Sequence, residues 1–316
     1  MSTALFLLCL VSWGTSWIAI KFQLAVDPSV SVAYRFLAAG LILQIFYRIK
    51  GGVLTNLKLK DHGIFFVHGL LMFCLNYNLV YASSKYLTSG LVALMFSTLA
   101  FMNIFNGRLF LKTPIEKNVF LASFLGLTGL VIVFFEELHT TQYSVALITG
   151  IIIGLVSTYF ASLGNIWVVR FKKSEWSPLR MSAYSMLYGG LVSLTYCLVT
   201  GKSMSVPLTV PYVSSFLYLT LFATIGAFGA YLTLLSREGA SKAAYIAYLF
   251  PILALGISSV VEGYKWTAFN IAGFAIILTG NLILSGKLSP KKLMRRLNEP
   301  VVVALPQVNA PEKKSC

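Results

Sequence analysis

The chain has 316 residues, of which 57% are hydrophobic and only 11% are charged. Soluble chains are about a quarter charged, so this composition excludes an ordinary soluble protein and indicates a surface that faces lipid. The net charge of +15 would suggest nucleic-acid binding in a soluble protein. Its meaning here depends on where the basic residues fall along the chain.

Ten long apolar runs follow one another along the chain. A helix needs about 20 mostly apolar residues to cross a bilayer, whereas barrel strands alternate apolar and polar residues over about ten positions. These runs are longer and apolar on all sides, so the sequence predicts an all-α polytopic membrane protein. The predicted transmembrane helices are 3–22, 30–48, 63–82, 88–109, 117–135, 144–169, 179–199, 211–234, 240–261 and 267–285.

The first run lacks the features of a secretion signal. The first basic residue, Lys21, follows the run instead of preceding it, and no small-residue cleavage site stands out. We therefore expect a retained helix. Trp13 and Trp17 are four residues apart and share one helical face. Because Trp13 falls near mid-span, away from the interfacial aromatic belts, we interpret the pair as a cavity wall; interfacial anchoring of Trp17 with packing is the alternative.

Polar side chains recur inside the later predicted helices. Arg35 suits a carboxylate or phosphate in a cavity, or alternatively extends outward to lipid headgroups. Amide and phenol groups within lipid need partners. The asparagines and tyrosines of these helices are therefore expected to form either an inward pocket or simple interhelical hydrogen bonds. The further residues predicted to bind substrate are Asn76, Tyr77, Tyr81, Tyr159, Asn165, Tyr231, Tyr245 and Tyr248.

Acidic residues are scarce within the predicted helices. Only Glu262 approaches the membrane, at the end of the ninth helix. Because ion-driven carriers use buried ionisable groups, we expect either a facilitator or proton coupling through His68 or Glu262; a hydrogen-bonded structural role is the alternative for His68. A strongly cationic substrate would lack a buried counter-charge. A zwitterion or an anion with an apolar body is therefore expected.

Most of the basic residues fall on one side of the predicted membrane. With the N-terminus inside, 20 of the 25 Lys and Arg lie in inside segments, so the positive-inside rule predicts that both termini are cytoplasmic. This asymmetry explains the net charge without nucleic acid. Segment 287–316 is predicted to be a basic and then polar cytoplasmic tail. The chain has no N-x-[ST] sequon, which favours a bacterial inner membrane. The five Lys and Arg residues in the segments predicted to be outside are Lys21, Arg35, Lys85, Lys202 and Lys265.

Two pairs of segments indicate an internal repeat. Segments 76–101 and 230–255 both have a Tyr in one helix, a short loop with Ser and basic residues, and a small-residue entry into the next helix. Segments 121–134 and 271–284 both carry Leu-Thr-Gly within a final helix. An odd number of helices per repeat would orient the two repeats oppositely. Such inverted repeats are typical of secondary transporters, whose substrate site lies between the repeats.

Three stretches resemble the EamA group of the drug/metabolite transporter superfamily. They read "SWGTSWIAIK" with "AYRFLAAGLIL", then "NYNLVYASSKYLTSGLVALMFSTL", and finally "VVEGYKWTAFNIAGFAIILTGNLIL". The resemblance implies two inverted five-helix repeats, 1–136 and 144–286, and export of amino acids or other small metabolites. The family's mid-helix proline has a match in Pro251 but none in the fourth helix, and Glu262 has no counterpart at 106–108.

Other functional classes have less support in the sequence. A membrane-embedded enzyme needs clustered catalytic groups, but the three histidines are far apart and no HExxH or GxSxG motif is present. A channel would need a ring of like charges or a repeated filter loop. A receptor or accessory subunit remains an alternative. We expect a carrier of a small molecule within the lipid bilayer, without a cofactor, metal or nucleic acid, as a monomer or loose homodimer.

Overall fold

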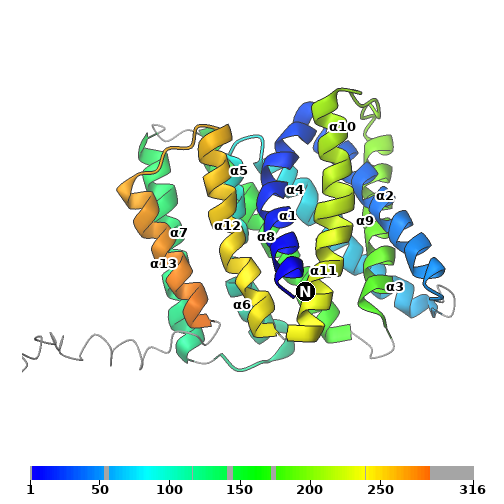
Figure 1. Ribbon diagram of the computed structural model, residues 1–316, viewed down its shortest axis with the longest axis horizontal. Helices are drawn as coiled ribbons and strands as arrows, with labels where there is room; N and C mark the ends of the chain where they lie inside the picture. Colours follow the sequence, from blue (N-terminus) through cyan, green and yellow to red (C-terminus); the bar gives the residue numbers. More distant parts are fainter. Residues whose placement is uncertain are drawn as a thin grey trace, which may run out of the picture.

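The secondary structure is helical throughout the part of the chain described by the computed structural model, residues 2–52, 57–115, 117–140, 145–171, 176–238 and 240–284 (Figure 1). The predicted tail, 287–316, lies outside these residues. The α-helices are α1 (Ser2–Phe22), α2 (Pro28–Ile49), α3 (Leu59–His68), α4 (Tyr77–Ser83), α5 (Ser89–Phe96), α6 (Leu99–Leu111), α7 (Lys117–Thr140), α8 (Val145–Phe171), α9 (Pro178–Val199), α10 (Val210–Leu217), α11 (Ala227–Glu238), α12 (Ala240–Val261) and α13 (Ala268–Leu284). A 3-10 segment, η1 (Gln23–Ala25), and two π-helical segments, η2 (Gly69–Asn76) and η3 (Tyr218–Gly226), complete the described elements.

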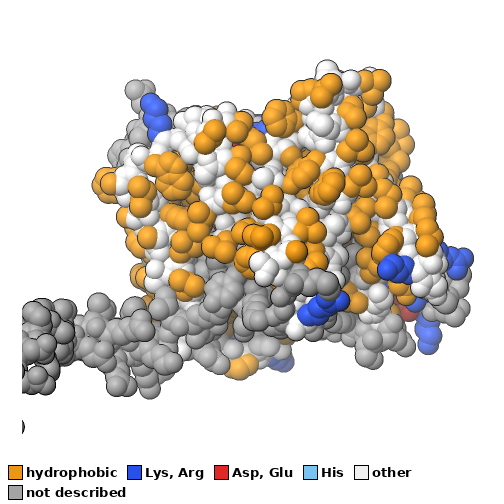
Figure 2. Space-filling model, in the orientation of Figure 1, with side chains coloured by type: hydrophobic (Ala, Val, Ile, Leu, Met, Phe, Trp, Pro, Cys, Tyr) orange, Lys and Arg blue, Asp and Glu red, His pale blue; other side chains and the backbone are white. Residues whose placement is uncertain are grey.

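Seven helical stretches among the described residues are long and apolar enough to cross a bilayer. They are Thr3–Ala25, Pro28–Ile49, Leu59–Ser83, Ser89–Leu111, Val145–Phe171, Pro178–Val199 and Val210–Tyr231. Shorter apolar stretches occur in α7, α12 and α13. Figure 2 shows hydrophobic side chains spread over the flank of the helices. The prediction of an all-helical polytopic membrane protein is confirmed, whereas the count of ten spans, their inverted repeat and their orientation stay predictions.

Two of the long helical stretches contain a π-helical turn. Segment η2 lies between α3 and α4, and η3 lies between α10 and α11. The hydroxyl of Thr224 donates to the carbonyl oxygen of Leu219, 2.7 Å away, and so satisfies a backbone acceptor within η3. Single π-helical turns inside α-helices often occur at functional sites, and both segments contribute residues to the cavity described below.

The fourth predicted helix is interrupted although it contains no proline. Helix α5 ends at Phe96 and α6 begins at Leu99. The hydroxyls of Ser97 and Thr98 donate to the carbonyl oxygens of Leu94 and Met95 at 2.6 Å in each case. These side chains compete with the helical backbone pattern, so they account for a break at the place where the resemblance expects proline. In the second half of the chain, Pro251 lies inside α12.

Small residues allow two helix pairs to pack closely. Helix α2 packs along α9, and α7 packs along α13 at the opposite end of the molecule (Figure 1). A Cβ atom on Gly129 of α7 would lie 2.4 Å from the carbonyl oxygen of Gly273, and one on Gly273 would lie 2.7 Å from the carbonyl oxygen of Gly129. The absence of side chains at these positions therefore permits backbone contact, which is typical of helix pairs in membranes.

Candidate functional site

A cavity of about 390 Å³ lies between the two outer helix pairs. Its wall includes residues of α1, α2, η2, α4, α8, η3, α11, α12 and α13, together with residues at the α5–α6 break. Of the eleven residues predicted to bind substrate, seven line this cavity. They are Trp13, Trp17, Arg35, Asn76, Tyr77, Asn165 and Tyr231.

Exposure differs between the two ends of the cavity. Ile20 and Val80, near the ends of α1 and α4, are each only 3% exposed. At the other end, Asn103 and Tyr231 are partly exposed and Ala247 is exposed. Among the described residues, the cavity is therefore closed near Lys21 and more exposed at the end lined by Asn103, Tyr231 and Ala247.

Among the described residues of the cavity wall, Arg35 is the one that carries a charge, and it is only 3% exposed. Its Nε and Nη2 atoms donate to the hydroxyl of Thr224 at 3.1 and 2.9 Å, and Nη1 donates to the hydroxyl of Tyr81 at 3.2 Å. The guanidinium carbon also lies 5.0 Å from the ring centroid of Tyr77 and 5.2 Å from that of Phe36, a cation–π distance. The side chain thus points inward, so the alternative of an outward extension to headgroups is wrong.

This guanidinium retains donors and an uncompensated charge. An arginine has five N–H groups, and the three hydrogen bonds to Thr224 and Tyr81 leave two without an acceptor among the described residues. No carboxylate lies within ion-pair distance of Arg35 in the described part of the chain. A buried charge without a counter-ion is costly, so an anion bound here would stabilise the site.

Aromatic rings form much of the remaining wall. The ring centroid of Trp13 lies 5.2 Å from that of Tyr231 and 5.9 Å from that of Phe228. Its indole nitrogen donates to the backbone oxygen of Ala223 at 3.2 Å. These contacts place the first tryptophan inside the protein and beside η3.

Trp17 contributes a second aromatic group. Its ring stacks on Phe250 at 6.1 Å between centroids and contacts Phe96 at 5.4 Å. The indole nitrogen is buried and has no hydrogen-bond partner among the described residues, and the same holds for the side-chain oxygen of Asn281, another wall residue. Buried polar atoms are rarely unpaired. Besides the guanidinium, the described wall therefore includes a buried neutral donor and a buried neutral acceptor that are free to bind a ligand.

The two asparagines predicted to bind substrate are partly engaged by protein atoms. Asn76 accepts a hydrogen bond from the hydroxyl of Ser157 at 3.0 Å and donates to the carbonyl oxygen of Met72 at 3.2 Å. Asn165 donates to the side-chain oxygen of Asn103 at 3.4 Å. Both line the cavity, but these bonds also fit the interhelical role that the sequence left open.

Two of the other predicted tyrosines, Tyr81 and Tyr159, are not among the residues that line the cavity. Tyr81 lies behind the wall, where its hydroxyl accepts the bond from Arg35. Tyr159 is 41% exposed on α8. Tyr231 lines the cavity and Tyr159 does not, because their side chains leave their helices in different directions. Residue type alone does not predict that direction. The side chains of Tyr245 and Tyr248 lie outside the described residues.

His68 is buried away from the cavity wall. Its Nδ1 atom lies 2.9 Å from the hydroxyl oxygen of Ser185, and its ring meets the edge of Phe73 at 5.5 Å between centroids. This environment supports the structural interpretation of His68.

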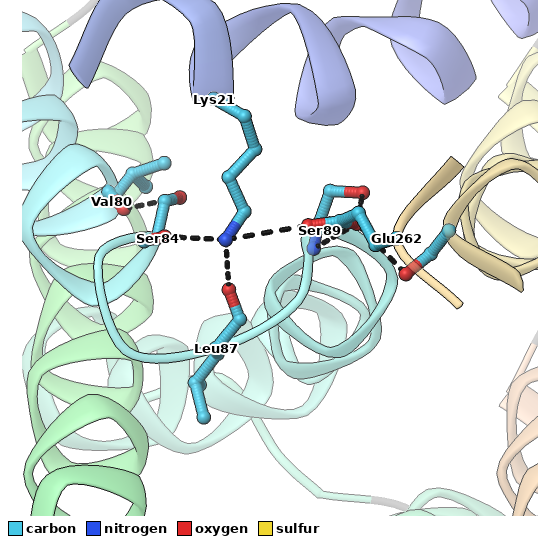
Figure 3. Close-up of polar contacts among 7 residues, drawn as sticks. Lys21, Val80, Ser84, Leu87, Ser89 and Glu262 are labelled. Carbon is cyan, nitrogen blue, oxygen red and sulfur yellow. Dashed lines mark hydrogen bonds and ion pairs between the residues drawn. The ribbon is translucent and has the colours of Figure 1, made fainter. Parts of the chain in front are cut away.

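Glu262 takes part in a polar cluster at the closed end of the cavity (Figure 3). Its Oε1 atom lies 3.3 Å from Nζ of Lys21. Lys21 also donates to the backbone oxygens of Ser84 and Leu87 at 2.7 and 2.6 Å. The other carboxylate oxygen accepts bonds from the backbone nitrogen of Ser89 at 2.8 Å and from the Ser89 hydroxyl. We call these five residues the end cluster; it joins the ends of α1 and α12 to the α4–α5 loop.

Comparison with known proteins decides the family. A model of the EamA-like transporter family matches residues 1–135 and 148–286. The chain belongs to the EamA-like transporter family. The resemblance read from the three sequence stretches is thereby confirmed.

Individual EamA relatives are similar over most of their length. The uncharacterized inner membrane transporter YedA of Escherichia coli (strain K12) is 27% identical, covering 87% of this chain and 89% of its own. The uncharacterized transporter YvbV of Bacillus subtilis (strain 168) is 26% identical, covering 92% and 93%. A probable amino-acid metabolite efflux pump of Salmonella typhimurium is 23% identical, covering 87% and 91%.

A solved crystal structure has a similar fold. It superposes with a TM-score of 0.64 at 15% identity and covers 94% of this chain and 98% of its own. Together with the apolar helices, the family and the names of its relatives support an integral membrane transporter. They favour a transporter over an enzyme.

Proposed function

We propose that the protein is a secondary transporter of a small zwitterionic or anionic metabolite, such as an amino acid or a related compound. It works by alternating access in a bacterial inner membrane, by export or facilitated exchange. The observation that carries this proposal is a cavity closed at one end, in whose wall aromatic rings surround a buried guanidinium with no carboxylate partner among the described residues.

Several features support two inverted repeats around this cavity. The π-helical segments η2 and η3 occupy corresponding places in the third and eighth predicted helices. The pairs α2–α9 and α7–α13 join the second predicted helix to the seventh and the fifth to the tenth. Pairs of this kind are expected about a pseudo-two-fold axis, and transporters with inverted repeats place their substrate at such an interface.

The closed end corresponds to the outside under the positive-inside prediction. Lys21 and Glu262 lie in two of the outside segments. With that orientation, the described state would be open toward the cytoplasm, and opening of the end cluster would expose the cavity to the other side. The described wall holds no carboxylate, which supports facilitated movement over proton coupling at the substrate site.

A reconstitution experiment tests the proposal. Purified protein in liposomes is offered a pool of labelled amino acids, organic anions, nucleotide sugars and sugar phosphates, with and without a pH gradient. We expect saturable flux that Arg35→Ala with Trp17→Ala abolishes, while Tyr159→Ala, on the outer surface of α8, retains it. Flux that ignores the gradient supports a facilitator.

The same vesicles address the accessory or receptor alternative. Folding of each variant is checked by its thermal unfolding and by its elution as a single species. If the folded wild type moves no solute in the pool, the proposed metabolite transport is contradicted and an accessory role gains support. If both variants move solute as fast as the wild type, the assignment of the site is contradicted.

A further inference from the structure

We propose that the cavity selects a monoanionic carboxylate with an apolar or aromatic body over the zwitterion and the cation of the same skeleton. This inference rests on the proposed transport function and narrows its substrate class. It follows from the charges in the wall, from the free donors of Arg35 and from the rings beside them.

Two N–H groups of the guanidinium have no acceptor among the described residues. Nε and Nη2 both donate to Thr224 Oγ1, so this contact uses the edge of the guanidinium that these two atoms share. The second N–H of Nη2 lies on the other edge, beside Nη1, and Nη1 has one N–H beyond its bond to Tyr81. Arginine binds carboxylates through N–H groups of this kind. Because Thr224 and Tyr81 fix the plane, little side-chain entropy remains to be lost on binding.

The number of charges favours a monoanion. Arg35 is the basic residue among the described wall residues, and none of these residues is acidic. A carboxylate would neutralise the guanidinium. An ammonium group next to that carboxylate, as in an amino acid, would lie close to the guanidinium without an anionic partner, and like charges repel strongly where water is excluded. A dianion such as a phosphate ester would keep an unpaired negative charge.

The rest of the wall suits an apolar body. Trp13, Trp17, Phe96 and Phe250 present rings to the cavity. The rings of Phe36 and Tyr77 lie within cation–π distance of the Arg35 guanidinium. Binding sites of this type combine an apolar wall with a few polar groups that orient the ligand. The guanidinium orients the ligand here.

Binding of four probes with one phenyl skeleton tests this selectivity. They are 3-phenylpropanoate, phenylalanine, phenethylamine and the neutral 3-phenylpropanamide. Binding to the full-length protein in lipid nanodiscs is measured by calorimetry at pH 7. Equilibrium binding is used because weak acids cross lipid unaided. We expect 3-phenylpropanoate to bind at least tenfold more tightly than phenylalanine or the amide, and phenethylamine to bind most weakly.

Variants of Arg35 show whether the guanidinium causes the preference. Arg35→Gln should remove the advantage of the carboxylate over the amide, Arg35→Lys should keep part of it, and Tyr159→Phe should leave it unchanged. Phenylalanine binding as tightly as 3-phenylpropanoate would overturn the inference, as would binding of none of the four probes or an unchanged preference in folded Arg35→Gln.

The vesicle assay distinguishes failure of the proposed carboxylate preference from failure of the transport proposal. If phenylalanine or another zwitterion moves saturably while the carboxylates do not compete with it, the anion preference is overturned and transport stands. If no solute moves although 3-phenylpropanoate binds with the expected preference, the transport proposal fails and the anion site stands.

Discussion

Replacing Glu262 by glutamine should open the closed end of the cavity. The end cluster joins α1, α12 and the α4–α5 loop through Glu262 and Lys21 (Figure 3). In Glu262→Gln the shape is kept and the charge is lost. Lys21 retains the backbone oxygens of Ser84 and Leu87, so the change removes the ion pair and weakens the bonds from Ser89 without emptying the cluster.

The expected size of the effect follows from distance and exposure. Two unit charges 3.3 Å apart attract by about 5 kcal/mol at an effective dielectric constant of about 20. The side chains of Lys21 and Glu262 are 24% and 14% exposed, and both would regain hydration on opening, so most of this attraction cancels. A net loss of about 1–3 kcal/mol remains, which is the range for a buried polar group that loses its partner. It corresponds to roughly a 5- to 150-fold rise in the population open at this end.

Cysteine labelling measures that population. The reporter is Ile20→Cys, a wall position that is 3% exposed in the closed state, in a background without the four natural cysteines. A membrane-impermeant methanethiosulfonate reagent is applied from the side that carries Lys21. We expect its rate of reaction to rise by the same factor in Glu262→Gln. Lys21→Met should raise the rate at least as much, because it also removes the bonds to Ser84 and Leu87. Adding Glu262→Gln to Lys21→Met should change the rate little, because the ion pair is already lost.

A second ion pair provides the matched control. Asp27 and Lys202 lie 2.9 Å apart, with side chains 28% and 38% exposed, and neither lines the cavity. Exposed pairs contribute little, so Asp27→Asn should leave the labelling rate unchanged. A change of less than twofold in folded Glu262→Gln, or the same change in Asp27→Asn, would refute the role of the end cluster in closure.

Two further predictions concern stability. Gly129→Ala should lower the free energy of unfolding by about 1–3 kcal/mol, because its Cβ would lie 2.4 Å from the Gly273 oxygen. Gly256→Ala is the control, because its Cβ would meet nothing within 4 Å. Equal melting temperatures of the two variants would contradict close α7–α13 packing. Burial raises the pKa of Asp27, but bonds from Ser29 and Lys202 outweigh it and hold that pKa below the ordinary 3.8. The stability that Asp27 adds is thus present above pH 3.8 and is lost as the pH falls through the lowered pKa. The melting temperatures of wild type and Asp27→Asn should therefore converge only in strong acid. An unchanged difference in strong acid would contradict this role of Asp27.

Much of the candidate site was accessible from sequence because burying polar groups in lipid is costly. Arg35 and the two tryptophans of α1 stand out within apolar runs, where any polar or amphipathic side chain needs a reason. The structure brings these three residues to one cavity. Their partners were not predictable: Thr224 is 189 residues from Arg35 in the chain, and a polar residue in an apolar run does not indicate which helix it faces.

The sequence by itself determined the membrane class and the helical architecture, because the cost of exposing backbone to lipid depends on local composition and run length. Only the tertiary structure decided which side of each helix faces the cavity. Lipid and protein interior are both apolar, so a membrane helix carries little amphipathic pattern to distinguish its faces. Tyr231 therefore lines the cavity while Tyr159 faces outward. Lys21 likewise meets Glu262 because the ends of α1 and α12 converge, which is a property of packing and not of either segment.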